Sequence, residues 1–231
     1  ACRKFEIPVV SGNVSFYNET NGLSIYPTPI LGMVGLIEDT KAITTQWFKH
    51  PGDHIFLLGE TKEDLGGTEY LKVIHSREQG SPPWLDLDGE KALHSCLLTL
   101  IRNGLVQSAH DCSEGGLLVT LAECCLTHPS ILFGATVTLL QHRLRLDALL
   151  FGESPSRVLI SIKPEHLDRM MKTIQNWGVP ITKLGRVTQG NMDLTVQGPQ
   201  EQLVCQVKVS LSEMADQWHN SLARQLGTEQ S

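Results

Sequence analysis

The chain has 231 residues, of which 41% are hydrophobic and 19% are charged, and its formal net charge at pH 7 is −6. This length fits one large domain, or one domain with part of another, and the apolar content is enough for a full core. The negative charge argues against a nonspecific nucleic-acid binder, which usually carries a basic face. We find no uninterrupted apolar run long enough for a membrane span and no signal-peptide pattern, so we expect neither.

The first forty residues read as the end of one domain. Residues 7–10 and residues 28–37 are apolar runs that predict strands, the second of them buried. The sequence turns polar between Asp39 and Pro51, where we place a domain boundary. We therefore predict one truncated domain over residues 1–40 and a complete one over residues 41–231.

The polar segment at residues 11–20 lies between these two predicted strands. Gly12 would let a ligand approach the backbone closely, Asn13 offers an amide oxygen and Ser15 a hydroxyl. Oxygen donors of this kind suit Mg²⁺ that is held jointly by protein and phosphate. The same residue types also form ordinary surface hairpins, and the residues alone leave both interpretations open.

Beyond Gly52, predicted strands alternate with predicted helices, which indicates an α/β domain with a mixed sheet. The expected strands cover residues 54–59, 135–139, 158–162, 181–187, 192–197 and 203–209. The expected helices cover residues 89–103, capped by Asp88, residues 164–177, and a closing helix from Ser212. Residues 181–187 and 192–197 are predicted to pair as a hairpin across a Gln-Gly-Asn turn.

The stretch at residues 108–123 is the most informative part of the chain. It predicts a short strand, a tight turn through Asp111, and an apolar-faced helix that begins near Ser113 and Glu114. A strand that ends in an acid before a Gly-Gly helix start is a plausible cradle for a phosphate or a metal–phosphate group. Spacing alone favours the simpler interpretation, a well-capped core helix in which Asp111 completes the turn.

Three further features call for an interpretation. His110 could act as a general base, but a single histidine in such a turn is more often a packed, hydrogen-bonded residue. Glu153 and Arg157 could face an anion, although an internal ion pair is the safer prediction. The glycine pair at residues 66–67 is predicted to allow close packing rather than to bind a ligand.

The six cysteines include no CxxC pair and lack the spacing of zinc ligands. Cys96, Cys124 and Cys125 fall on predicted helices, where small buried thiols are common. We therefore expect reduced cysteines and a cytoplasmic location.

Four motifs occur together in this order: SGNVSFYNET at residues 11–20, YPTPILGMVG at residues 26–35, LGGTEYL at residues 65–71 and HDCSEGGL at residues 110–117. In this order they resemble the last part of the synthetase subunit of formylglycinamide ribonucleotide amidotransferases, or phosphoribosylformylglycinamidine synthases. The resemblance covers nearly the whole chain. It implies a C-terminal domain like that of aminoimidazole ribonucleotide synthetase, preceded by the last strands of an N-terminal-type domain.

The resemblance also implies a function. The family uses ATP and Mg²⁺ to activate the amide oxygen of formylglycinamide ribonucleotide, and ammonia from a glutaminase then displaces the phosphate to give an amidine. By motif, Gly12 would contact ATP, Asn13 would ligate Mg²⁺ and Ser15 would contact the ribonucleotide. Asp111 matches an acid that ligates Mg²⁺ at a second nucleotide site in large family members. The turn at residues 153–157 matches a substrate-binding Glu-Ser-Gln turn, except that proline replaces glutamine.

The same resemblance implies partners. The family's principal catalytic residues lie in the first half, so we expect an isolated chain of this extent to be inactive. A separate glutaminase subunit and a small bridging subunit would complete the complex. Unpaired strands at residues 5–37 predict a homodimer of the fragment. The alternative is a non-catalytic domain that holds partner subunits or a structural nucleotide, and a related phosphate-transferring enzyme of the same superfamily ranks below both.

Overall fold

The computed structural model describes residues 1–14, 18–26, 28–128 and 130–227. The described chain divides into two units, Ala1–Ile43 and Thr44–Ser231, and we describe each by itself. None of the helices in the described ranges is long and apolar enough to cross a membrane.

The first unit contains little regular structure. It holds helix α1 (Cys2–Phe5), a two-stranded antiparallel pair of β1 (Glu19–Thr20) and β2 (Leu23–Ser24), and the 3₁₀ turn η1 (Thr40–Ala42). The predicted strands at residues 7–10 and 28–37 do not form, and the second is exposed rather than buried. A strand must pair its backbone groups with a neighbour, and the described residues of this unit supply none for these two runs.

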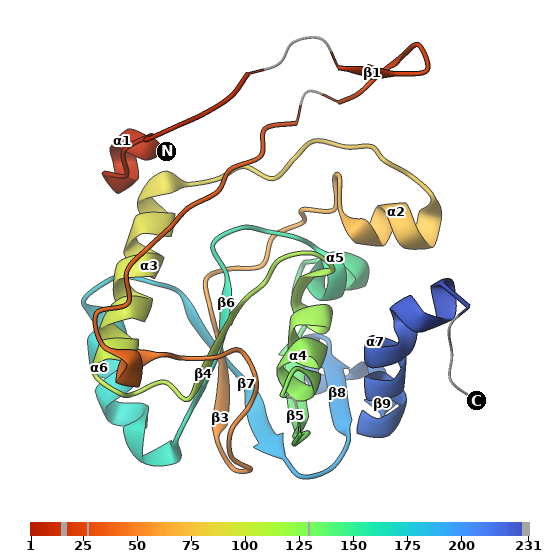
Figure 1. Ribbon diagram of the computed structural model, residues 1–231. Helices are drawn as coiled ribbons and strands as arrows, with labels where there is room; N and C mark the ends of the chain where they lie inside the picture. The colour runs from red at the N-terminus through yellow and green to blue at the C-terminus, as the bar shows by residue number, and fades with distance from the viewer. Residues whose placement is uncertain (15–17, 27, 129, 228–231) are drawn as a thin grey trace. The chain divides into compact units, whose positions relative to one another are not determined.

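The second unit is built on one sheet of seven strands (Figure 1). The strands are β3 (His54–Leu58), β4 (Ser108–Asp111), β5 (Gly134–Leu140), β6 (Val158–Ile162), β7 (Ile181–Thr188), β8 (Met192–Gln197) and β9 (Leu203–Val209). Their order across the sheet is β4-β6-β3-β7-β5-β8-β9. The pair β5–β8 is parallel and the other pairs are antiparallel, so the predicted α/β class with a mixed sheet is confirmed.

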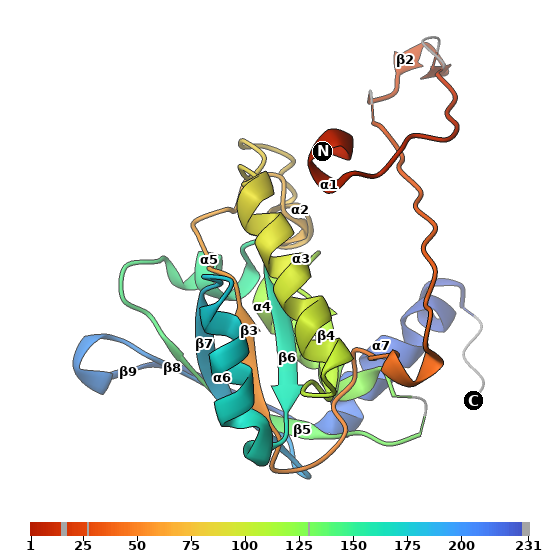
Figure 2. The ribbon, with the colours of Figure 1, turned by 90° about the vertical axis from the view of Figure 1, so that its left-hand side faces the viewer.

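Helices cover both faces of this sheet. They are α2 (Glu69–His75), α3 (Leu87–Arg102), α4 (Gly116–Leu126), α5 (Leu146–Phe151), α6 (Leu167–Gln175) and α7 (Leu211–Gln225), with 3₁₀ turns η2 (Pro164–His166) and η3 (Pro199–Glu201). Figure 2 shows α3 and α6 side by side on one face. In β3, Phe56 and Leu58 join the core under α3 and α6, whereas Ile55 and Leu57 join the core under α4. This alternation is the period of two expected for a strand buried on both faces.

Two sequence predictions about this unit are wrong. Strands β7 and β8 do not form a hairpin, because β5 lies between them and pairs with both. Helix α3 is capped by Asp86, whose Oδ1 accepts a hydrogen bond from the backbone N–H of Asp88 at 3.0 Å, and not by Asp88. Local turn signals favour pairing between sequence neighbours, but burial of β5 between two apolar strands decides the order.

Candidate functional site

The predicted ligand-binding segment lies in the first unit. Gly12 and Asn13 are exposed and belong to no helix or strand, and a Cβ on Gly12 would meet no atom within 4 Å. Ser15 lies outside the described residues. The structure therefore displays the Asn13 amide to solvent, and the roles of these three residues stay predictions.

Asp111 is the last residue of β4, and its side chain is 74% exposed. Its Oδ1 lies 3.4 Å from Nδ1 of His110, while Nε2 of His110 lies 2.8 Å from Oε2 of Glu123 on α4. Burial disfavours the charged form of His110, but the two carboxylates outweigh it, so the pKa of His110 is raised. The structure confirms the prediction that His110 is a packed, hydrogen-bonded residue. The sequence analysis did not identify Glu123 as the partner of His110, although Glu123 belongs to the helix that it predicted after the turn.

The turn after Asp111 is tightly built. Gly115 and Gly116 have φ angles of +79° and +69°, and α4 begins at Gly116 rather than near Ser113. A Cβ on Gly116 would lie 2.6 Å from the carbonyl oxygen of Gly152. Both glycines are therefore required by conformation, and Gly116 also by its close approach to the turn at residues 152–157.

Glu153 binds the turn that the sequence suggests as a possible phosphate cradle. Its Oε1 accepts hydrogen bonds from the backbone N–H of Gly115 at 2.8 Å and from that of Glu69, the first residue of α2, at 2.9 Å. The carboxylate thus ties two helix starts together, and such starts favour a negative charge. The Gly115 N–H is consequently already bonded within the chain, which supports the capped-helix interpretation of this turn.

Arg157 does not pair with Glu153, so the predicted ion pair is wrong. The guanidinium is 2% exposed and donates to the carbonyl oxygens of Ser154 and Gly152 and to Oγ1 of Thr61. Burial lowers the pKa of Arg157. Because a planar guanidinium can hold several carbonyl groups at once, Arg157 fixes the turn at residues 152–157 to the loop after β3.

The glycine pair at residues 66–67 packs closely, as predicted, but against a loop. A Cβ on Gly66 would lie 2.2 Å from the carbonyl oxygen of Ser81. The N–H of Gly67 donates to the carbonyl oxygen of Gln79 at 3.0 Å. These contacts hold the segment before α2 beside the segment that leads to Trp84.

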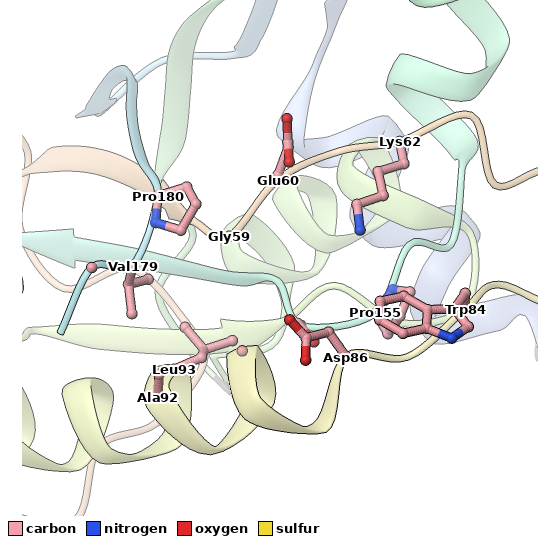
Figure 3. A pocket seen from close by; sticks show the side chains of 13 residues that line it. Gly59, Glu60, Lys62, Trp84, Asp86, Ala92, Leu93, Pro155, Val179 and Pro180 are labelled. Carbon is pink, nitrogen blue, oxygen red and sulfur yellow. The ribbon is translucent and has the colours of Figure 1, made fainter.

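A pocket of about 250 Å³ opens beside this segment, and the sequence analysis did not foresee it (Figure 3). We call it the Trp84 pocket. The residues that matter for its chemistry are Gly59, Lys62, Trp84, Asp86, Leu93 and Val179. The whole lining comes from four separate stretches of the chain, within residues 59–62, 84–93, 155–156 and 178–180, so no local sequence signal marks the pocket.

Lys49 is a second feature that the sequence did not reveal. Its ammonium donates to Oγ1 of Thr45 at 2.6 Å and to the carbonyl oxygen of Trp47 at 2.5 Å, and it lies 4.6 Å from the centre of the Trp47 ring. Burial lowers the pKa of Lys49 to about 8. Within the described ranges, no three side chains of His, Cys, Asp or Glu are grouped so that they could hold a metal ion.

Comparison with known proteins places these features in a family context. The PurL subunit of phosphoribosylformylglycinamidine synthase from Alkaliphilus metalliredigens is 46% identical over 222 residues, which is 96% of this chain and 29% of that protein. The PurL subunit from Caldanaerobacter subterraneus is 47% identical over 198 residues, or 86% of this chain and 26% of that protein. The chain thus spans less than a third of the length of these curated relatives, and they confirm the resemblance drawn from the four motifs.

Solved structures show the same fold. Thermotoga maritima PurL complexed with FGAR superimposes with a TM-score of 0.57 at 19% identity, covering 76% of this chain and 30% of that chain. Thermotoga maritima PurL complexed with ATP gives a TM-score of 0.55 at 19% identity, covering 76% of this chain and 28% of that chain. Residues 50–197 match the family model of the AIR synthase related protein, C-terminal domain. The chain therefore belongs to the AIR synthase related family, through its C-terminal domain.

Proposed function

We propose that the chain is part of the synthetase of phosphoribosylformylglycinamidine synthase. This ATP-dependent ligase converts formylglycinamide ribonucleotide, ATP and glutamine-derived ammonia into formylglycinamidine ribonucleotide, ADP and phosphate in purine biosynthesis. The observation that carries the proposal is the identity of 46% to a PurL subunit over 96% of the chain. Solved relatives with this fold are complexed with FGAR and with ATP, which supports the choice of substrates.

Within this proposal, the exposed segment around Gly12 forms one wall of the nucleotide and ribonucleotide site. Gly12 lets the ATP phosphates approach the backbone, the Asn13 amide oxygen binds Mg²⁺, and Ser15 orients the ribonucleotide. The described part of this segment fits such a role, because Asn13 is exposed and its oxygen is the hard donor type that Mg²⁺ prefers. When bound, Mg²⁺ neutralises charge on the phosphates.

We propose Asp111 as a metal ligand at a second nucleotide site. Its carboxylate is 74% exposed and therefore accessible to a hydrated cation. The contact of one oxygen with His110 at 3.4 Å leaves the other oxygen for this role. The neighbouring Gly115 N–H is bonded to Glu153, so this turn offers a carboxylate to a metal rather than a backbone cradle to a phosphate.

The proposed setting is a cytoplasmic complex with a glutaminase subunit and a small bridging subunit. All six cysteines are free, which agrees with a reducing compartment. A solved relative is described as PurLQS from Thermotoga maritima, which supports an assembly of several subunits. The exposed apolar residues of the first unit, such as Ile30 and Val34, suit burial against a further chain, including a second copy of this one.

A non-catalytic role for the isolated chain is the second candidate. It is favoured by the finding that the β4–α4 turn is satisfied internally by Glu153 and that Arg157 is fully engaged with backbone carbonyls. In that case the chain supports the fold of the synthetase, and the chemistry takes place elsewhere in the enzyme.

Complementation of a strain that lacks the synthetase tests the proposal. Full-length genes would carry Asn13→Ala, Ser15→Ala or Asp111→Ala, with Ser11→Ala as a matched control in the same exposed segment. Loss of growth without purines for the first two variants, from soluble protein, supports the active-site role. Normal growth with both would show that the segment is only a turn. A soluble but inactive Asp111→Ala protein indicates a ligand role, an insoluble protein indicates a structural role, and normal growth shows that Asp111 has neither.

A further inference from the structure

We propose that the Trp84 pocket binds a free α-amino acid with an apolar side chain. The pocket lies wholly in the second unit, and the proposal does not depend on the function proposed above. Three observations carry it: a preformed wall, two opposite charges that do not pair with each other, and an exposed indole on a pocket with an apolar floor.

The wall of the pocket is rigid. Gly59 has a φ angle of +90°, and a Cβ there would lie 2.0 Å from the carbonyl oxygen of Ser156. The Gly59 N–H donates to the carbonyl oxygen of Pro180 at 2.8 Å, and Pro155 and Pro180 both line the cavity. Prolines restrict the backbone, so the shape exists before any ligand arrives, and little entropy is lost on binding.

Two opposite charges face the cavity. Figure 3 shows the Lys62 amine and the Asp86 carboxylate directed into it from different segments, while the Glu60 carboxylate points away. Lys62 and Asp86 form no ion pair within 4.0 Å, and the Lys62 ammonium has no hydrogen-bond partner among the described residues. Oδ1 of Asp86 caps α3, but Oδ2 accepts no hydrogen bond within the described chain. Both residues are exposed, so a ligand that carries both charges would replace water at the two groups at once.

The remaining surface suits an apolar side chain. Leu93 is 2% exposed and Val179 is 8% exposed, and together they form the floor. Trp84, which is 73% exposed, lines another part of the pocket and lies near Pro155 in Figure 3. A ligand side chain placed against the indole would remove apolar surface of both the ligand and Trp84 from water.

Size and charge together select the ligand class. The cavity of about 250 Å³ lies below the usual range of about 300–1,000 Å³ for drug-sized ligands, which argues against a nucleotide. An α-amino acid carries its ammonium and carboxylate on one carbon. Its carboxylate would bind the Lys62 ammonium, its ammonium would bind Oδ2 of Asp86, and its side chain would lie against Trp84.

Binding can be followed in ¹H–¹⁵N spectra of the 231-residue chain, in which each of the four tryptophans gives one indole signal. Trp84→Phe identifies the signal of Trp84. We expect L-leucine or L-phenylalanine to shift this signal in a saturable way. 3-Methylbutylamine and 4-methylpentanoate, which carry one charge each, should bind at least about tenfold more weakly than leucine.

Variants distinguish the contribution of the two charges to ligand binding from an effect on the fold. Lys62→Met and Asp86→Asn should each weaken leucine binding at least about tenfold. Asn caps a helix about as well as Asp, so Asp86→Asn keeps α3 intact. Glu60→Gln, whose parent carboxylate points away from the cavity, should leave binding unchanged. The proposal is overturned if no amino acid gives a saturable shift, if the singly charged analogues bind as well as leucine, or if only adenosine monophosphate binds.

Discussion

Glu153 and Gly115 lie 38 positions apart in the sequence, and Oε1 of the first accepts a hydrogen bond from the backbone N–H of the second at 2.8 Å. The same oxygen accepts from the N–H of Glu69. One carboxylate therefore satisfies the first free donors of two helices and joins three loops at one end of the sheet. This arrangement leads directly to a prediction about stability.

Glu153→Ala should lower the free energy of unfolding by about 2–3 kcal/mol, because it leaves two partly buried N–H groups without an acceptor. Glu153→Gln should cost less, since its amide oxygen can still accept. Urea unfolding measures both values. Glu78→Ala, at an exposed loop position, serves as the control and should be nearly neutral. Equal values for Glu153→Ala and the control would show that the carboxylate does not stabilise the turn.

Gly116→Ala should destabilise the chain by about 3 kcal/mol or more, because its φ is left-handed and the new Cβ would meet a carbonyl oxygen. The matched control is Gly190→Ala, where the φ is ordinary and a Cβ would meet nothing within 4 Å. Its free energy of unfolding should stay within about 0.5 kcal/mol of the parent value. Thermal unfolding of the two variants in parallel distinguishes the effect of this site from a general effect of alanine.

His110 should stabilise the fold more in acid than in alkali. Its pKa is raised in the folded state, so the folded chain binds the proton more tightly than the unfolded chain does. The stabilisation is fully present below the pKa of the unfolded state, about 6.5, and is lost as the pH rises through the folded pKa. The difference in free energy of unfolding between the parent and His110→Gln should therefore shrink from pH 5.5 to pH 8.5. A difference that is constant with pH would show that the proton on His110 does not contribute.

The contribution of Lys49 to the free energy of unfolding should show the opposite dependence on pH. Its folded pKa of about 8 lies below the ordinary value of 10.5, so the unfolded chain binds more protons between these values. Stability should therefore rise with pH across this interval, and Lys49→Met should abolish that rise. Reductive ¹³C-methylation followed by NMR titration measures the amine directly. A titration midpoint near that of the exposed lysines would contradict the prediction.

The sequence predicted the elements whose signals are local. Strands β3 and β6 are short apolar runs, and the helical stretch after Pro164 ends before Gly178, which has a φ of +63°. Leu117, Leu121 and Cys124 are buried on α4, which agrees with the apolar-faced helix predicted after the turn. In each case the side-chain period and the turn residues lie within one segment.

The sequence could not predict features that depend on distant parts of the chain. The apolar run at residues 28–37 predicts a strand, but a strand exists only with a partner, and the described residues of its unit supply none. The order β7-β5-β8 depends on which strands pack against each other. The Trp84 pocket depends on four separate segments of the chain. Arg157 sits near Glu153 in sequence, yet carbonyl groups rather than that carboxylate surround its guanidinium.

The position of β3 between β6 and β7 has a consequence for how the chain acquires its structure. β3 leaves the ribosome before both of its neighbours, which lie about a hundred residues or more further along the chain, as in the pair Leu58 and Val158. Loop closure over such distances slows folding. During synthesis, the apolar residues of β3 therefore stay without their partner strands until β6 and β7 have been made, and in this interval the nascent chain is exposed to aggregation and to chaperones.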